Sequence, residues 1–295
     1  MNSIPYPFFV STMAFYGTDP ITMLAQANSE GFPLEFSSAL PYQEDMESLF
    51  YQYPHPKLVH NYFPAPSIPF VLNLASDDPL IRTQSIEHVL KGLRWSKKGG
   101  GSFYCAHAGF CIDPKPSDLG QQLKQSTDRI NREKHWGLFT ESVRTILPLA
   151  EAMGLDFYIE NNVTAKMNLN VHRESPLLCS DPKEIKQLIE EINHPRLGIL
   201  LDTAHLKVSA NTLNFSPLEA VKLVAPYVRA IHHSDNEGEL DNNQPIEEDY
   251  WFGQFMPIFS NIPHVLEVKK LSIAAIKAQI KLLRSFNNAQ KNKPY

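Results

Sequence analysis

The second half of the sequence contains four short apolar runs that each end in a side chain able to bind a metal ion. The runs are DFYIE, LGILLD, VRAIH and HVLE, and they end at Glu160, Asp202, His232 and Glu267. Carboxylate oxygens and imidazole nitrogens are common protein ligands of divalent cations. Three carboxylates that face one another repel unless a cation lies between them. If these side chains meet, the simplest occupant of the site is one divalent metal ion.

The composition of these runs is typical of buried parallel strands. Short apolar runs bounded by Gly, Pro and Asn, and separated by amphipathic stretches, predict a repeating strand-helix chain. The same pattern predicts strands at residues 6–12, 32–37, 57–62, 102–108, 155–160, 197–202, 227–232 and 264–269. In a closed barrel of such units the carboxyl ends of all strands meet at one mouth. The four potential metal ligands would then converge from distant parts of the sequence.

Helix start signals lie between several of the predicted strands. Four dipeptides place a capping oxygen one residue before a proline: Asp19-Pro20, Asp78-Pro79, Asp181-Pro182 and Ser216-Pro217. Proline suits the first helical position because its missing N–H would be unpaired there anyway. We therefore predict an α/β fold, a (β/α)8 barrel that forms a single domain over residues 1–295. An open doubly wound sheet is the alternative, but the segment after the first strand lacks the Gly-rich phosphate loop of that fold.

The composition is that of an ordinary globular protein, with 43% hydrophobic and 20% charged residues. Lys and Arg number 27 against 32 Asp and Glu, and the formal net charge of -5 disfavours binding to a nucleic acid backbone. The start of the chain has no basic region, and no apolar run reaches the roughly 18 residues that span a membrane. We predict a cytoplasmic protein with neither a nucleic acid nor a membrane as its partner.

Seven short motifs resemble the xylose-isomerase-like barrel superfamily in their order and spacing. They are VHNY, FVLNLAS, AHAG, IENN, LLDTAH, IHHSDNEG and LEVK. The superfamily includes sugar and sugar phosphate isomerases and epimerases, and apurinic endonucleases with a multi-zinc site. The resemblance implies a TIM barrel, and the single-metal epimerases imply a ligand set of Glu160, Asp202, His232 and Glu267.

The resemblance also assigns roles to three histidines. His205, within DTAH, matches a residue that binds substrate in the epimerases and a further zinc in the endonucleases. His60 and His107 match endonuclease histidines that hold an additional zinc with the shared glutamate. A second metal is therefore one alternative here, and contact with substrate is the other. The third endonuclease zinc is doubtful, because Asp241-Asn242-Asn243 places an amide, a poor zinc ligand, where those enzymes have a histidine.

The four assigned ligands have structural alternatives. A lone buried glutamate is rare, so Glu160 and Glu267 would otherwise need internal salt bridges. Asp202 would otherwise serve only as the cap of the following turn. Only one of His232 and His233 can face the barrel, since side chains alternate along a strand. The match to the superfamily selects His232.

Two further side chains are candidates for contact with substrate. Lys269 lies two residues after Glu267, so it would point the same way, further toward the opening, as a ligand for a substrate anion or as a general acid. Trp251 lies in an aromatic cluster after the seventh strand, and an indole face stacks well on a sugar ring. A solvated strand end and packing of the loop are the respective alternatives.

These residue types suit metal-assisted proton transfer. Three carboxylates and one imidazole favour Mn, Mg or Co, with Zn as a further candidate. Such an ion stabilises the enediolate that forms when a carbon-bound proton leaves a hydroxy-carbonyl compound. Glu160 and Glu267 would act as the catalytic acid and base. We predict an isomerase or epimerase of carbohydrate metabolism that acts on a small sugar, a sugar phosphate or a related compound.

Two other functions stay open. A metal-dependent phosphoesterase, including endonuclease-like action at abasic sites, would use His60, His107 and Glu160 to hold a second metal. A sugar-binding barrel without turnover is the other. The chain lacks the arginine that the epimerases place just after His232 to hold substrate, which puts their sugar specificity in doubt. The sequence also leaves open whether the protein forms a homo-oligomer.

Overall fold

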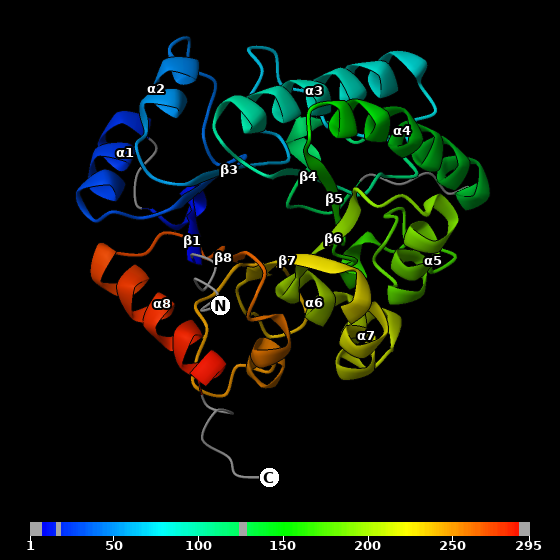
Figure 1. Cartoon of the computed structure of the whole chain (residues 1–295). Helices are drawn as coiled ribbons and strands as arrows, with labels where there is room; N and C mark the ends of the chain where they lie inside the picture. Colours follow the sequence, from blue (N-terminus) through cyan, green and yellow to red (C-terminus); the bar gives the residue numbers. More distant parts are fainter. Residues whose placement is uncertain (1–7, 16–18, 124–128, 289–295) are drawn as a thin grey trace.

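The predicted barrel is present as eight parallel strands that close on themselves (Figure 1). The computed structural model describes residues 8–15, 19–123 and 129–288. The strands are β1 Phe8–Ser11, β2 Leu34–Phe36, β3 Lys57–His60, β4 Phe103–His107, β5 Asp156–Glu160, β6 Leu197–Asp202, β7 Val228–His233 and β8 His264–Leu266. Neighbours in sequence are neighbours in the sheet, and β8 pairs in parallel with β1. The predicted (β/α)8 class is therefore confirmed.

Helices surround the barrel and connect its strands (Figure 1). They are α1 Pro20–Ser29, α2 Met46–Gln52, α3 Pro79–Lys98, α4 Arg132–Ala152, α5 Pro182–Ile192, α6 Thr203–Leu213, α7 Pro217–Val224 and α8 Ile273–Asn288. Short 3-10 helices lie at η1 Thr12–Ala14, η2 Pro116–Asp118, η3 Lys166–Asn168, η4 Ala225–Tyr227 and η5 Gly253–Phe259. The outer ring closes as well, because Lys277 of α8 forms an ion pair with Glu30 at the end of α1.

The helix starts predicted from the Asp-Pro and Ser-Pro pairs are confirmed. The capping oxygens accept hydrogen bonds from the first turn of α1, α3, α5 and α7, at Thr22, Leu80, Lys183 and Glu219. In each case proline occupies the first turn. A cap of this kind typically stabilises a helix by about 1 kcal/mol. Local sequence is therefore sufficient to predict where these helices begin.

Apolar side chains fill two regions separated by the strands. The larger region lies between the strands and the surrounding helices, and includes Phe36, Phe50, Phe139 and Ile146. The smaller region consists of Phe9, Leu58, Phe103, Cys105, Tyr158, Leu200, Ala230 and Val265. Because side chains alternate along a strand, these two sets belong to opposite faces of the sheet. The smaller set fills the interior of the barrel.

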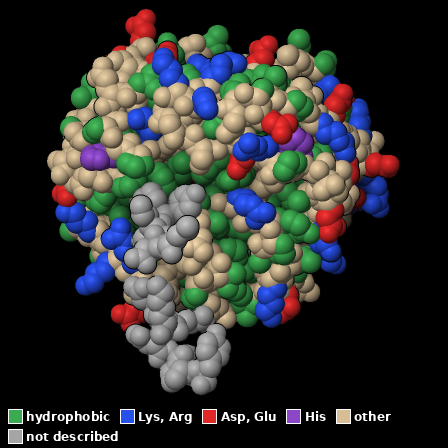
Figure 2. Space-filling model, in the orientation of Figure 1, with side chains coloured by type: hydrophobic (Ala, Val, Ile, Leu, Met, Phe, Trp, Pro, Cys, Tyr) green, Lys and Arg blue, Asp and Glu red, His purple; other side chains and the backbone are tan. Residues whose placement is uncertain are grey.

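The surface in view mixes charges of both signs. Figure 2 shows Lys and Arg side chains interspersed with Asp and Glu over the described part of this face. Among the described residues, no helix combines the length and the apolar character needed to cross a membrane.

One buried histidine in the helical layer makes stability depend on pH. His88 of α3 packs against the rings of Tyr62 and Phe70, with centroids 5.2 and 5.6 Å away, and its Nε2 atom has no hydrogen-bond partner. Burial lowers the pKa of His88 from 6.5 to about 4. The unfolded chain therefore binds this proton more readily than the folded chain, so stability is present above pH 6.5 and falls as the pH drops toward 4.

We expect His88→Phe to remove this contribution, because phenylalanine keeps the ring packing and cannot bind a proton. Between pH 7 and pH 5 the parent protein should lose about 2 kcal/mol more stability than the variant. Urea unfolding at both pH values measures the difference, and other titrating groups contribute equally to both proteins. Equal losses in the two proteins would contradict this role of His88.

Candidate metal centre

The polar site lies one layer above the apolar interior of the barrel. On six strands an interior residue is followed two positions later by a residue that can bind a metal: Leu58 by His60, Cys105 by His107, Tyr158 by Glu160, Leu200 by Asp202, Ala230 by His232 and Val265 by Glu267. A step of two residues keeps the side chain on the same face of a strand. Interior packing therefore directs these polar side chains to the carboxyl-terminal mouth of the barrel.

The structure brings the four predicted ligands together. One atom from each of Glu160, Asp202, His232 and Glu267 lies within 4.8 Å of the others. His232 Nδ1 is central, at 2.8 Å from Glu267 Oε2, 3.6 Å from Glu160 Oε1 and 3.9 Å from Asp202 Oδ2. This group could hold a metal ion.

The hydrogen bonding of this group fits a bound cation. Both carboxylate oxygens of Glu160, Oδ2 of Asp202 and Nδ1 of His232 are buried without a hydrogen-bond partner. His232 Nδ1 is close to Glu267, but the contact does not have hydrogen-bond geometry. Each buried polar atom left unpaired costs about 1–3 kcal/mol. A cation in this group would satisfy Asp202 Oδ2, His232 Nδ1 and one oxygen of Glu160.

Asp202 has two separate roles within one side chain. It is the N-cap of α6, where Oδ1 accepts a hydrogen bond of 2.7 Å from the backbone N–H of His205. Its other oxygen, Oδ2, is turned to the unpaired group. The Asn161 side chain holds the backbone of Asp202 through two hydrogen bonds, donating to its carbonyl and accepting from its N–H. The capping role and the potential ligand role are therefore compatible.

The ionisation of the carboxylates reflects the imidazoles around them. Burial raises the pKa of Asp202 to about 8, although His205 opposes this shift. Burial also disfavours the charged form of Glu267, but His232 outweighs burial and lowers the pKa to about 2. For Glu160 the neighbouring His107, with other histidines, outweighs burial and holds the pKa well below its usual value. Asp202 is thus the carboxyl that most needs further positive charge in order to ionise near neutral pH.

The three other predicted histidines also lie at the mouth. Nε2 of His60 and Nε2 of His107 lie 3.1 and 3.4 Å from Glu160 Oε2, so these residues form a second group that could hold a metal. His205 Nδ1 donates a hydrogen bond of 2.9 Å to the backbone carbonyl of Asn161. His60 and His205 are buried, whereas the His107 side chain is 27% exposed, the most exposed of the three.

Asp241 joins this polar group although Asn243 replaces the histidine of the endonuclease pattern. Asp241 Oδ2 lies 3.3 Å from His205 Nε2, and Asp241 Oδ1 is buried without a partner. Asn243 adopts a left-handed backbone conformation with φ of 48°, and its carbonyl accepts from the N–H of Lys269. Asn243 thus contacts Lys269 through its backbone carbonyl.

Two predicted substrate contacts stay predictions. Lys269 lies past the end of β8, and its side chain is exposed. Trp251 is half-buried and packs against Phe252 with centroids 5.5 Å apart. Within the described part of the chain, no side-chain hydrogen bond or ion pair joins either residue to the carboxylate group. The packing of Trp251 agrees with the structural alternative for the aromatic cluster.

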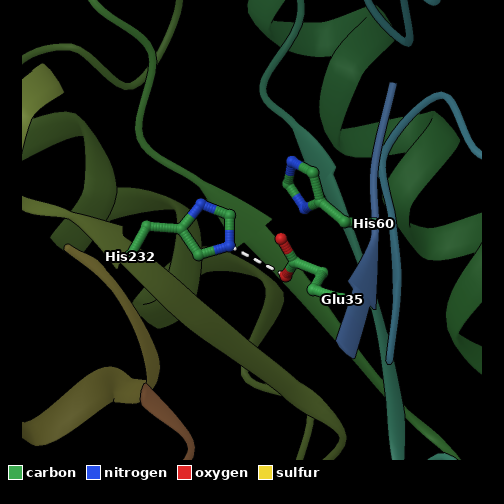
Figure 3. A group of neighbouring side chains, drawn as sticks. All are labelled: Glu35, His60 and His232. Atoms are coloured by element: carbon green, nitrogen blue, oxygen red, sulfur yellow. Dashed lines mark hydrogen bonds and ion pairs between the residues drawn. The ribbon is translucent and has the colours of Figure 1, made fainter. Parts of the chain in front are cut away.

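The sequence patterns missed one acidic residue of the site, Glu35. It lies in the middle of β2, is completely buried and has its Oε2 atom 2.9 Å from His232 Nε2 (Figure 3). Glu35 does not end an apolar run, because Phe36 continues it, so the pattern of ligands at strand ends does not include this residue. The signal was nevertheless present, since Glu35 is the charged residue within the apolar stretch FPLEF.

The two neighbouring histidines of β7 face opposite sides of the sheet, as predicted from strand alternation. His232 faces the carboxylates, whereas His233 Nε2 lies 2.8 Å from His264 Nδ1 and His233 Nδ1 lies 3.1 Å from the Tyr250 hydroxyl. Burial lowers the pKa of His233 well below 6.5 and that of His264 to about 4, so both are neutral near pH 7. These contacts occupy both ring nitrogens of His233 on the outer side of the sheet.

Comparison with known proteins identifies the family and leaves the substrate open. Over 214 residues the chain is 23% identical to the probable endonuclease 4 of Mesomycoplasma hyopneumoniae strain 7448, which spans 68% of this chain and 67% of the relative. The fold of the present chain is similar to that of a D-tagatose 3-epimerase-like protein. The TM-score is 0.71 at 16% identity, and the similarity covers 96% of this chain and 99% of the other.

The fold is also similar to D-psicose 3-epimerase from Clostridium cellulolyticum H10 in complex with D-tagatose. The TM-score is 0.60 at 19% identity, and 96% of each chain is covered. At identities this low, the structural similarity shows a shared fold and no more. Function has to be argued from the site. The sequence model of the family described as "Xylose isomerase-like TIM barrel" matches residues 15–285, which is most of the chain. The protein therefore belongs to the xylose isomerase-like TIM barrel family.

Proposed function

We propose that this protein is a divalent-metal-dependent isomerase or epimerase of a small sugar, a sugar phosphate or a related hydroxy-carbonyl compound. The observation that carries the proposal is the buried group of three carboxylates and one imidazole at the mouth, in which Glu160 and Glu267 come from distant strands. The donor set of Glu160, Asp202, His232 and Glu267 suits Mn, Mg, Co or Zn. The family, which contains both epimerases and endonuclease-like proteins, is compatible with this activity.

Glu160 and Glu267 are the candidates for the acid-base pair of this reaction. A bound divalent cation would stabilise negative charge that develops on substrate oxygens, as a Lewis acid. One glutamate, ionised, would take the proton from a substrate carbon through a carboxylate oxygen. The other glutamate, which must first have taken up a proton from solvent, would return that proton to the opposite face of the carbon, and exchange of both carboxyl groups with solvent would restore the starting state. The product is then the epimer. Return of the proton to the adjacent carbon gives an aldose-ketose isomerisation instead.

The surroundings of the glutamates support proton transfer in a site with little water. The interior side chains below them, which include Tyr158, Leu200 and Val265, are buried and apolar. Water therefore does not reach the carboxylates through the barrel, and electrostatic interactions at the mouth are strong. His107 is partly exposed beside Glu160, which supports a role for it in contact with a hydroxyl or carbonyl of the substrate.

Solvent exchange tests this proposal directly. We expect deuterium from solvent to enter one carbon-bound position of the correct keto-sugar or sugar phosphate when the protein is incubated in D₂O with Mn, Mg, Co or Zn. NMR of the substrate measures the exchange, and protein treated with a chelator is the control. Binding of a sugar without exchange would instead identify a sugar-binding barrel without turnover.

A metal-dependent phosphoesterase is the second candidate function. It is favoured by one observation, the group formed by His60, His107 and Glu160, which could hold a further metal beside the first. The number of ions per chain separates the two functions, since the epimerase arrangement needs one and the hydrolase arrangement needs at least two. Elemental analysis of the purified protein, together with an assay for incision of abasic duplex DNA, distinguishes them.

A further inference from the structure

The two ring nitrogens of His232 lie in different environments. Nδ1 faces Glu160, Asp202 and Glu267, where the proposed cation would bind. Nε2 lies on the other side of the ring, 2.9 Å from Glu35 Oε2 (Figure 3). Both side chains are completely buried. The ring of His232 thus connects the proposed metal centre to a carboxylate on a strand that supplies none of its four proposed ligands.

Glu35 is not placed as a ligand of the same cation. The group centred on His232 Nδ1 contains Glu160, Asp202 and Glu267, whereas Glu35 belongs to a different group, with His60 and His232. It approaches the imidazole from the side away from Nδ1. A direct bond from Glu35 to an ion bound at Nδ1 would require its carboxylate to pass around the ring.

The chemistry of imidazole gives this contact a consequence. A neutral histidine carries its proton on one nitrogen, and a metal binds only the nitrogen without a proton. An ionised carboxylate accepts hydrogen bonds and cannot donate them. A proton on Nε2 therefore satisfies Glu35 Oε2 and leaves the lone pair of Nδ1 directed at the carboxylate group.

We propose that Glu35 is a positioning residue that fixes the tautomer and the ring orientation of His232, so that Nδ1 is presented to the divalent cation. The inference rests on the proposed metal centre. Partners of this kind typically contribute 10–100-fold to the affinity of the metal. The backbone around Glu35 is held on both sides, because β2 pairs with β1 and β3 and its residues Leu34 and Phe36 are buried on the other face of the sheet.

The state of His232 in the parent protein provides the first test. In protein loaded with zinc, which is diamagnetic, long-range ¹H–¹⁵N NMR of the histidine rings should show His232 with its proton on Nε2 and its Nδ1 bound to metal. Assignment uses the signals lost in His232→Gln. A proton on Nδ1, with zinc bound through Nε2, would overturn the inference without the need for a Glu35 variant.

Substitution of Glu35 provides the second test. Glu35→Gln keeps the size of the side chain but presents an amide whose N–H₂ end can turn toward His232. We expect its dissociation constant for zinc, measured by competition with a chelator, to rise about 10–100-fold, and the His232 ring signals to indicate a mixture of tautomers. Glu184→Gln is the matched control, because Glu184 is paired with Arg132, which is on α4, outside the barrel. The control should bind zinc like the parent.

Failure of this inference can be distinguished from failure of the proposed function. A parent protein that binds no divalent cation removes the metal centre itself. A parent that binds one ion, with the same affinity and the same His232 spectrum in Glu35→Gln, overturns the positioning role alone. A parent with two ions, of which Glu35→Gln loses one, would also overturn it, because Glu35 would then be a ligand in its group with His60.

Discussion

Glu267→Gln is expected to lower turnover by at least about 100-fold while the protein stays folded, since this is the usual contribution of a general acid or base. The reason is local. Glu267 lies directly after β8 with its Oε2 atom 2.8 Å from His232 Nδ1, and His232 lowers the pKa of Glu267, so at neutral pH the carboxylate is ionised and has a free lone pair for the proton that leaves the substrate carbon. An amide of the same size cannot accept that proton.

The measurement is solvent deuterium exchange at the substrate carbon, with turnover followed in the same sample. Glu160→Gln should have an effect of similar size, because Glu160 is the proposed partner in the proton transfer. Glu239→Gln makes the same chemical change at an exposed position of the β7–β8 segment and should leave exchange unaltered. Full exchange in both Glu160→Gln and Glu267→Gln would rule out this acid-base pair.

Asp202→Asn is expected to remove metal binding without removing the helix cap. Asparagine caps helices about as well as aspartate, so its side-chain oxygen can still accept the hydrogen bond from His205 N–H that begins α6. The second oxygen, Oδ2, becomes an amide nitrogen that carries no charge and no free lone pair for a cation. The variant therefore separates the two roles that one side chain has in the structure.

Thermal or urea unfolding with and without added metal measures this effect. A cation at 100 times its dissociation constant should stabilise the parent by about 2.7 kcal/mol, and the same concentration should have almost no effect on Asp202→Asn. Asp181→Asn is the matched control, because Asp181 caps α5 and has no part in the carboxylate group. The proposed centre would be wrong if Asp202→Asn were stabilised by metal as strongly as the control.

The sequence by itself determined the architecture and most of the site. The short apolar runs and the Asp-Pro pairs act locally, through strand burial and helix capping, so the barrel and several helix starts could be predicted from neighbouring residues alone. Once a closed parallel barrel is assumed, the ends of its strands must meet. For that reason the convergence of Glu160, Asp202, His232 and Glu267 followed from their positions in the chain.

Tertiary structure alone decided what the side chains contact across the barrel. Glu35 and His232 are separated by 197 positions and meet because β2 and β7 face each other through the interior, a relation that no local pattern contains. The partners of His233 on the outer face, His264 and Tyr250, likewise come from later segments of the chain. Strand periodicity gives the face of a residue, but the closure of the sheet determines which residues share the space inside it. The partner of each buried charge is fixed only there.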